Sequence, residues 1–212
     1  MIEEIALAAP PSRREARRHN RREAILDVAA CSFLEFGYAA TTMNAIAATL
    51  GGSKGTLWSY FPSKELLFAA VLERATAAFR RELGLILDPG DLPERALRRF
   101  CREFIIRVTS PDAIALHRLV LGEVQRFPEI GRAFHEGVSS ITRRSLKEYI
   151  SAAMANGKLR ADNAEVAAEQ LTHLCLSGCH YRLLLGLDQR ATPAMIAADT
   201  ERATTTFLRA YG

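Results

Sequence analysis

The stretch 41–64, TTMNAIAATLGGSKGTLWSYFPSK, constrains the fold of this 212-residue chain more than any other. Its first half repeats apolar residues at the i, i+3, i+4, i+7 spacing of one helical face. The pair Gly51-Gly52 then permits the left-handed backbone that ends a helix. A second short helix follows, which Ser53 is placed to cap and Pro62 to stop. The stretch therefore predicts two short helices joined by a tight turn.

The second of these helices has an outer face without the Glu and Lys residues of an ordinary solvated helix. Leu57 points inward, which leaves Gly55 and Ser59 on the opposite side, with Thr56 and Trp58 flanking them. Glycine costs about 1 kcal/mol inside a helix, so its use here is to let the backbone approach something bulky. We interpret this face as a recognition helix for the DNA major groove. A small helical hairpin packed in a core is the alternative.

The rest of the chain is patterned as helices separated by Gly and Pro residues. Apolar spacing predicts helices at about 18–36, 63–83, 93–109, 112–126, 129–156, 163–186 and 192–210. No run shows sustained period-two alternation, so we expect no sheet and an all-α fold class. The stretch 88–93, DPGDLP, predicts a loop between the N-terminal helices and the rest.

Positive charge is concentrated near the N-terminus. Residues 12–22 hold six arginines and one glutamate, in a chain whose net charge is only +4. Because Pro10-Pro11 breaks any preceding helix, residues 1–17 are expected to be a flexible basic arm. Arginines here suit DNA phosphates, where binding releases counterions, although a solvated tail is the ordinary alternative.

Several other classes of protein find little support in the sequence. No apolar window approaches the about 18 residues of a membrane span, and 2–9 lacks the basic flank of a signal peptide. The scattered cysteines Cys31, Cys101, Cys175 and Cys179 suit a reducing cytoplasm. There is no GxSxG, P-loop or HExxH motif, so we expect neither an enzyme nor a cofactor. Cys175 and Cys179 stand at i, i+4, which leaves a metal- or thiol-redox-responsive regulator as an alternative. A helical protein-interaction module is a more remote one.

Residues 21–72 resemble the DNA-binding domain of TetR-type transcriptional regulators. The matching features are the FGY–TT step, IA–LG, SKGTL–Y–F and SKE–LF at fixed offsets. Gly52 and Trp58 depart from the apolar residue and the tyrosine that are common at their positions. Residues 118–138 and 156–171 are similar to the AefR-like C-terminal domain of some of these proteins. The resemblance implies an arm at 1–17, a helix-turn-helix domain at 18–64, and a helical effector-binding and dimerisation domain at 65–212.

This resemblance also implies a cytoplasmic, sequence-specific regulator, by default a repressor. It would bind a palindromic operator in double-stranded DNA as a homodimer, and we expect a small hydrophobic or aromatic effector to release it. Carried over by position, the expected phosphate contacts are Thr42, Ser53, Lys54, Tyr60 and Lys64, and the expected base-edge contacts are Gly55, Thr56, Trp58 and Ser59. Core packing is the alternative for Tyr60 and Trp58.

The C-terminal helices are expected to divide two further tasks. The helices at about 163–186 and 192–210 would build the dimer as a four-helix bundle, through the stripe Ala167, Leu171, Leu174, Gly178 and Leu185. Packing of that stripe within one chain is the alternative. An effector pocket is expected to be lined by Phe79, Phe100, Cys101, Phe104, His117, Leu121 and Cys175, with plain core as the alternative. Such a lining suits a hydrophobic or aromatic ligand.

Overall fold

The computed structural model describes residues 12–51 and 54–212, and every regular element within them is helical. The expected all-α class is confirmed. The chain forms two compact units, Met1–Leu67 and Phe68–Gly212. The helix α4, Lys64–Ile86, begins in the first unit and continues in the second. The family resemblance implied a boundary slightly earlier, after residue 64.

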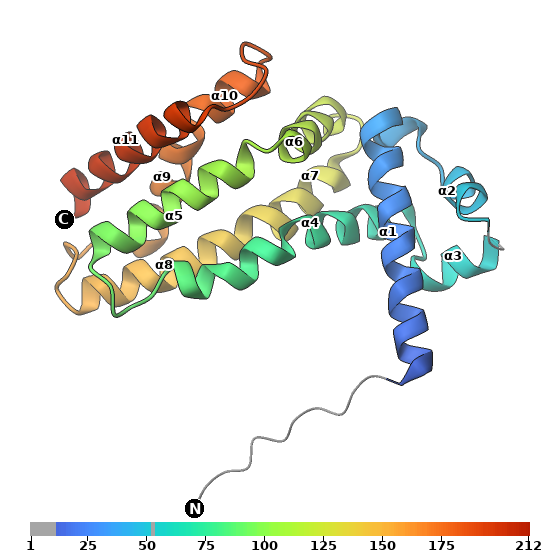
Figure 1. The fold of residues 1–212 in the computed structure, drawn as a ribbon, viewed down its shortest axis with the longest axis horizontal. Helices are drawn as coiled ribbons and strands as arrows, with labels where there is room; N and C mark the ends of the chain where they lie inside the picture. Colours follow the sequence, from blue (N-terminus) through green and yellow to red (C-terminus); the bar gives the residue numbers. More distant parts are fainter. Residues whose placement is uncertain (1–11, 52–53) are drawn as a thin grey trace, which may run out of the picture. The chain divides into compact units, whose positions relative to one another are not determined.

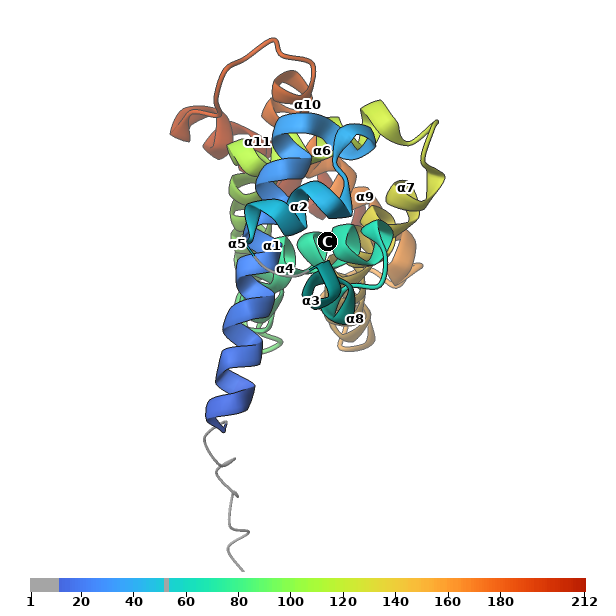
Figure 2. The same cartoon turned by 90° about the vertical axis from the view of Figure 1, so that its right-hand side faces the viewer.

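The first unit is built on a long helix that carries two short ones. Its elements are α1 (Arg13–Ala40), α2 (Met43–Thr49) and α3 (Lys54–Tyr60), and α2 and α3 lie beside α1 (Figure 1, Figure 2). Gly37, at φ 79°, interrupts the helical backbone of α1 in a conformation that favours glycine. The interruption turns Tyr38 into the core, where its ring stacks on Phe33 with centroids 5.7 Å apart.

The start of α1 differs from the expected flexible arm. Ser12 and Glu15 form a capping box: the Ser12 hydroxyl accepts the Glu15 N–H at 3.2 Å, and the Glu15 carboxylate accepts the Ser12 N–H at 2.7 Å. These hydrogen bonds from Ser12 lower the pKa of Glu15. The helix therefore begins at Arg13, and the prediction of a flexible arm through residue 17 is wrong for residues 13–17. Residues 1–11 of the predicted arm lie outside the described residues.

The second unit is a helical bundle with further helices at one end. The elements after α4 are α5 (Pro93–Val108), α6 (Pro111–Glu123), α7 (Pro128–Phe134), a π-helical turn (His135–Ser139), α8 (Ser140–Ala155), α9 (Ala164–Leu176), α10 (Cys179–Leu184) and α11 (Pro193–Tyr211). Figure 1 shows α5, α8, α9 and α11 side by side, with α6, α7 and α10 toward one end. Four of these helices start with proline, which tolerates the first helical position because the amide hydrogen there has no helical partner.

The helix expected over 163–186 is broken in two between α9 and α10. Gly178 has the non-helical angles φ −102° and ψ −119°, and a Cβ there would lie 2.0 Å from Asp199 Oδ2. The same Asp199 oxygen accepts the Cys179 N–H at 2.6 Å. The buried Asp199 carboxylate of α11 thus caps the start of α10. A continuous helix through Gly178 would remove this cap, because the Cys179 N–H would then bond within the helix. The helix expected over 129–156 is likewise interrupted, by the π-helical turn.

Candidate nucleic-acid interface

The helix α3 has the two faces that its sequence predicted. Leu57 is buried, as is Phe61 just beyond its end, whereas Gly55 and Ser59 are exposed and Trp58 retains 36% of its surface. Thr56 lies between these faces and is half-buried. Of the other residues predicted to contact DNA here, Ser53 lies outside the described residues, and Lys54 starts α3 with a side chain that is not described.

The outer face of α3 presents groups that match the major groove. The Ser59 hydroxyl donates to the Thr56 carbonyl oxygen at 2.7 Å, so its remaining capacity is to accept. Adenine and cytosine amino groups are the donors exposed in the major groove. The indole of Trp58 offers apolar surface for a sugar or a thymine methyl group. The face therefore combines close backbone approach at Gly55 with one acceptor and one apolar contact.

Two adjacent threonines at the start of α2 have different environments. Thr41 is buried and donates its hydroxyl hydrogen toward the carbonyl oxygens of Gly37, at 2.7 Å, and Ser32, at 3.0 Å, which ties α2 to α1. Thr42 is exposed, and its Oγ1 accepts the Ala45 N–H at 3.1 Å as the N-cap of α2. A hydroxyl that accepts one hydrogen bond still carries a proton to donate. Thr42 is thus suited to a phosphate oxygen.

Lys64 and Tyr60, the other predicted phosphate contacts, also take part in packing. Lys64 Nζ donates to the Tyr38 carbonyl oxygen at 2.8 Å and lies 4.2 Å from the centroid of the Tyr38 ring. An ammonium group has three hydrogens, so a phosphate would have to use another of them. Tyr60 is half-buried, with the Arg18 guanidinium 6.0 Å from its ring centroid. Packing within the first unit is therefore part of the role of both residues.

Most of the residues predicted to line an effector pocket are buried in the second unit. Phe100, Cys101 and Cys175 have no exposed surface, and Phe79 and Phe104 have almost none, because all five pack into the core of the second unit. A side chain that lines a cavity able to hold water keeps some accessible surface. Leu121, by contrast, is 53% exposed. In this structure these five residues are packed as the core alternative predicts, while an effector pocket beside them stays a prediction.

His117, the remaining predicted pocket residue, pairs with another histidine. Its Nδ1 lies 3.2 Å from Nε2 of His180, and its ring stacks on Phe134 with centroids 5.2 Å apart. Burial lowers the pKa of His117. Burial and then the nearby charge of His117 lower the pKa of His180 to about 4. Both imidazoles are therefore neutral near pH 7, and one donates to the other.

This pair predicts a loss of stability in acid. Between the ordinary histidine pKa of 6.5 and about 4, the unfolded chain binds a proton that folded His180 does not, so stability falls as the pH falls through this window. The contribution of His180 amounts to about 3 kcal/mol between pH 7 and pH 4. We expect His180→Gln, measured by urea unfolding, to be less sensitive to pH over this range than the unmodified chain. His135→Gln, at an exposed site, is the control. Equal pH dependence in the unmodified chain and His180→Gln would contradict the assignment.

The cysteine pair considered for metal or redox sensing is separated by the fold. Cys175 belongs to α9 and packs in the same core as Cys101, whereas Cys179 begins α10 beyond the break at Gly178. The i, i+4 geometry of one continuous helix, on which that alternative depended, is absent. Across residues 12–51 and 54–212, no group of three or more His, Cys, Asp or Glu side chains is close enough to hold a metal ion.

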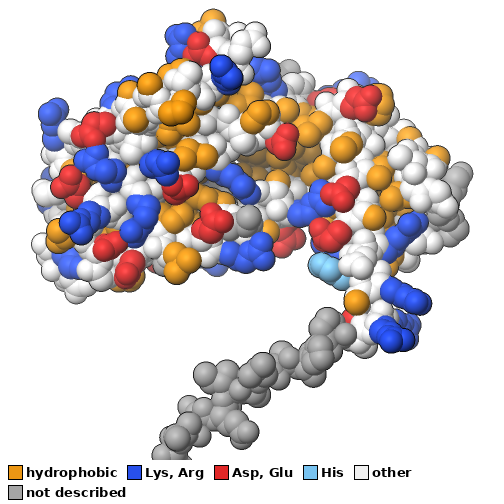
Figure 3. Space-filling view, in the orientation of Figure 1, with side chains coloured by type: hydrophobic (Ala, Val, Ile, Leu, Met, Phe, Trp, Pro, Cys, Tyr) orange, Lys and Arg blue, Asp and Glu red, His pale blue; other side chains and the backbone are white. Residues whose placement is uncertain are grey.

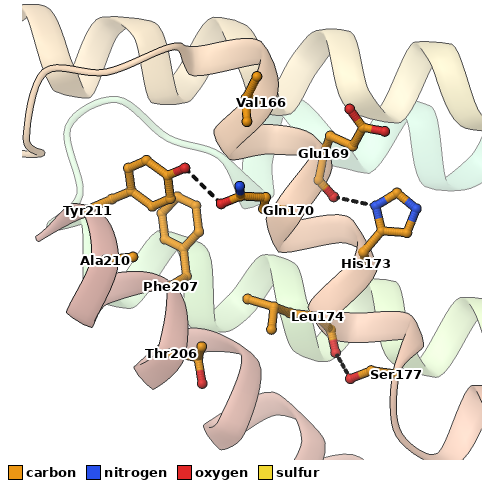
Figure 4. Close-up of a pocket in the computed structure, with 10 residues that line it drawn as sticks. All are labelled: Val166, Glu169, Gln170, His173, Leu174, Ser177, Thr206, Phe207, Ala210 and Tyr211. Atoms are coloured by element: carbon orange, nitrogen blue, oxygen red, sulfur yellow. Dashed lines mark hydrogen bonds between the residues drawn. The ribbon is translucent and has the colours of Figure 1, made fainter.

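A groove of about 620 Å³ runs between α9 and α11 (Figure 4). Its lining residues are Val166, Glu169, Gln170, His173, Leu174, Ser177, Thr206, Phe207, Ala210 and Tyr211. Across it, Tyr211 donates its hydroxyl hydrogen to Gln170 Oε1 at 2.8 Å (Figure 4). Sequence reasoning assigned the helix at about 192–210 to the dimer but named none of its residues, although the small Thr206 and Ala210 at i, i+4 were a readable signal.

Only part of the predicted dimer stripe reaches the surface. Leu174 lines the groove, and Leu185 is 56% exposed at the end of α10. Ala167 and Leu171 have no exposed surface and belong to the core of their own chain, so for them packing within one chain is the better description. Gly178 lies against Asp199, as described above.

The capped short helix α2 and the short helix α3 with its bare outer face have the arrangement of a helix-turn-helix domain, the type found in many transcriptional regulators. Residues 25–71 match the family described as bacterial regulatory proteins, tetR family, and residues 95–212 match the AefR-like transcriptional repressor, C-terminal domain. The chain therefore belongs to the TetR family of transcriptional regulators and has an AefR-like C-terminal domain. It is a DNA-binding regulator and not an enzyme.

Individual proteins of similar sequence or structure are also regulators of this kind by name. The uncharacterized HTH-type transcriptional regulator YhgD of Bacillus subtilis is 26% identical over 176 residues, which are 82% of this chain and 87% of YhgD. The flavonoid-responsive regulator FrrA is 31% identical, with a TM-score of 0.75 over 91% of this chain and 97% of FrrA. A structure from Mesorhizobium loti, described as a putative TetR-family regulator, shares the fold with a TM-score of 0.80 at 23% identity, over 92% and 98% of the two chains.

In the part of the chain that the structure describes, no helix combines the length and apolar character that crossing a membrane requires.

Proposed function

We propose that this chain is a cytoplasmic repressor that binds a palindromic operator as a homodimer and is released by a small hydrophobic or aromatic molecule. The observation that carries the proposal is the outer face of α3, where exposed Gly55 and Ser59 stand beside a partly exposed Trp58. Their value lies in the fit to a major groove.

A groove in the second unit supports a homodimer, which a palindromic operator would match. An operator read by one recognition helix per half-site is palindromic when the protein has two-fold symmetry. The groove between α9 and α11 offers the required surface, since Val166 and Leu174 give it apolar character and Thr206 and Ala210 leave space for a neighbouring helix. We propose that the same two helices of a second copy cover it, so that four helices pack together.

An aromatic effector is supported by the core of the second unit and by a relative. Phe104 stacks on Phe100 with centroids 5.5 Å apart and lies 6.1 Å from Phe79, so an aromatic ring would find similar neighbours. FrrA, 31% identical to this chain, is named as flavonoid-responsive. Because these rings are packed closely here, binding would require α4 and α5 to move apart locally. A shift of α4 would then be the route to the DNA-binding unit, into which that helix continues.

To test the proposal, the full chain is used to select the DNA duplexes it binds from a random-sequence pool. The affinity of the chain for the enriched sequences is then measured by fluorescence anisotropy. We expect a palindrome bound by two protomers, with a Kd of about 10⁻⁸ M or lower at physiological salt. Flavonoids and other aromatic compounds are then titrated into the complex, and an effector should release the DNA. Failure to enrich any duplex sequence would overturn the regulator proposal. Compounds that bind but leave operator affinity unchanged would overturn the effector mechanism alone.

Ala210→Glu tests the dimer surface. Ala210 is exposed and lines the groove, so a carboxylate there leaves the single chain folded but would be buried without a partner against a second copy. We expect analytical ultracentrifugation to show a monomer, with operator affinity reduced at least about 100-fold because a burial penalty of several kcal/mol opposes dimerisation. The matched control is Ala152→Glu on the exposed face of α8. A dimer of undiminished affinity in Ala210→Glu would place the interface elsewhere.

A further inference from the structure

The N-terminal part of α1 carries an ordered, strongly basic face. Arginines stand at 13, 17 and 21 and again at 14, 18 and 22, so two rows with i, i+4 spacing run along neighbouring sides of one helix. At about 100° per residue, they cover roughly half of its circumference. The acidic residues Glu15 and Glu23 fall outside that half. Figure 3 shows Lys and Arg side chains gathered at this end of α1.

Most of these arginines are held out in solvent. Arg13, Arg14, Arg17 and Arg18 are exposed, while Arg21 and Arg22 are half-buried. Within the described residues the one ion pair that any of the six makes is a loose one, between Arg22 and its neighbour Glu23 at 3.5 Å. Among residues 12–51 and 54–212, the charge of this face is therefore largely uncompensated, and holding like charges together in a helix is unfavourable unless a polyanion binds them.

The arginine face adjoins the recognition helix. The Arg18 guanidinium lies 6.0 Å from the ring centroid of Tyr60, the last residue of α3, and the Arg22 guanidinium lies 5.5 Å from that of Phe61. One edge of the face is thus fixed against the end of α3, and the capping box of Ser12 and Glu15 keeps the rest helical. Arginines on this surface can reach the same molecule as the outer face of α3.

We infer that residues 13–22 of α1 form a second DNA-contacting element, which binds the phosphates of the duplex flanking each half-site. The inference rests on the proposed operator binding and adds to it. A rigid arginine face contributes affinity without reading bases, because phosphate contacts carry no sequence information. Its ordering before binding reduces the conformational entropy that a flexible arm would lose.

The test compares Arg13→Gln/Arg14→Gln/Arg17→Gln with the unmodified full chain on its selected operator, at several salt concentrations. Glutamine keeps the helical propensity of arginine, and these three side chains are exposed and lie outside the ring contacts. We expect the plot of log affinity against log salt to become shallower by about 2 to 3 per protomer. At 0.1 M salt a slope change of 2 alone corresponds to about a 100-fold loss of affinity. The penalty for each base substitution in the operator should stay unchanged.

Two further variants separate the contribution of the arginine face to operator affinity from the effect of the net charge of the chain. Arg95→Gln/Arg132→Gln/Arg144→Gln removes the same charge from exposed positions of the second unit and should leave the slope nearly unchanged. His19→Pro retains all six arginines but breaks the helix before the recognition unit, so affinity should fall at least about tenfold relative to His19→Ala. If His19→Pro binds the operator with the same affinity as His19→Ala, the inference that the face must be pre-ordered is wrong.

The outcomes also distinguish this inference from the proposed function. An unmodified chain without a specific operator refutes the proposed function itself. A triple arginine variant that binds the operator with full affinity and an unchanged slope refutes only the DNA-contacting face. Loss of binding to phosphatidylglycerol vesicles by that variant, with operator binding intact, would assign the face to a lipid surface and overturn the inference.

Discussion

Replacing Gly55 by glutamate is expected to abolish specific operator binding and leave the fold intact. Gly55 is exposed on the outer face of α3, so a longer side chain there meets solvent in the free protein and the DNA in the complex. Glutamate is a better helix former than glycine by roughly 0.8 kcal/mol, so stability should be unchanged or slightly higher. On DNA, the added bulk blocks close approach, and the carboxylate faces phosphates. Affinity should fall toward the non-specific level, at least about 10³-fold, as measured by fluorescence anisotropy.

The matched control for this variant is Gly122→Glu. Gly122 is an exposed helical glycine in α6, and a Cβ built there meets no atom within 4 Å. The substitution makes the same change of charge and the same gain in helix propensity in the second unit, so operator affinity should change little. Retained specific binding by Gly55→Glu would mean that the outer face of α3 is not the surface that reads DNA.

The largest loss of stability is expected for Phe100→Ala. Phe100 is fully buried in α5, stacked on Phe104 with an angle of 10° between the rings, and lies within the main core of the second unit. Truncation removes the buried ring and leaves a cavity, which typically lowers the free energy of unfolding by about 3–5 kcal/mol. Chemical denaturation at a fixed protein concentration measures the loss, and the melting temperature should fall by about 10 °C.

A comparison with an exposed position sharpens this prediction. Leu92 precedes α5 with 64% of its surface exposed, so Leu92→Ala should change stability by less than about 0.5 kcal/mol. A loss below about 1 kcal/mol for Phe100→Ala would show that the ring is loosely packed. That result would favour an effector site beside Phe100 that opens with little displacement of α4 and α5.

The features that the sequence predicted well are those governed by neighbouring residues. Helix spacing, proline at helix starts and glycine at turns act over a few residues, so α2, α3 and most later helices were predicted close to their observed bounds. The two faces of α3 follow from the same local periodicity. The helical start of α1 was readable as well, because Ser12 and Glu15 have capping-box spacing, but the preceding prolines suggested a flexible arm instead.

The features decided by the tertiary structure depend on residues far apart in the chain. The break between α9 and α10 exists because the Asp199 carboxylate, twenty residues beyond Cys179, occupies the space beside Gly178 and accepts an amide hydrogen there. An apolar helical face does not specify whether it packs inward, against a ligand or against a second copy. Only the packing placed Phe100 and Leu171 in the core and left Leu121 exposed. Local hydrogen bonding and sterics thus determined the helix α3 and its two faces from sequence, while long-range packing alone assigned the core and the groove between α9 and α11.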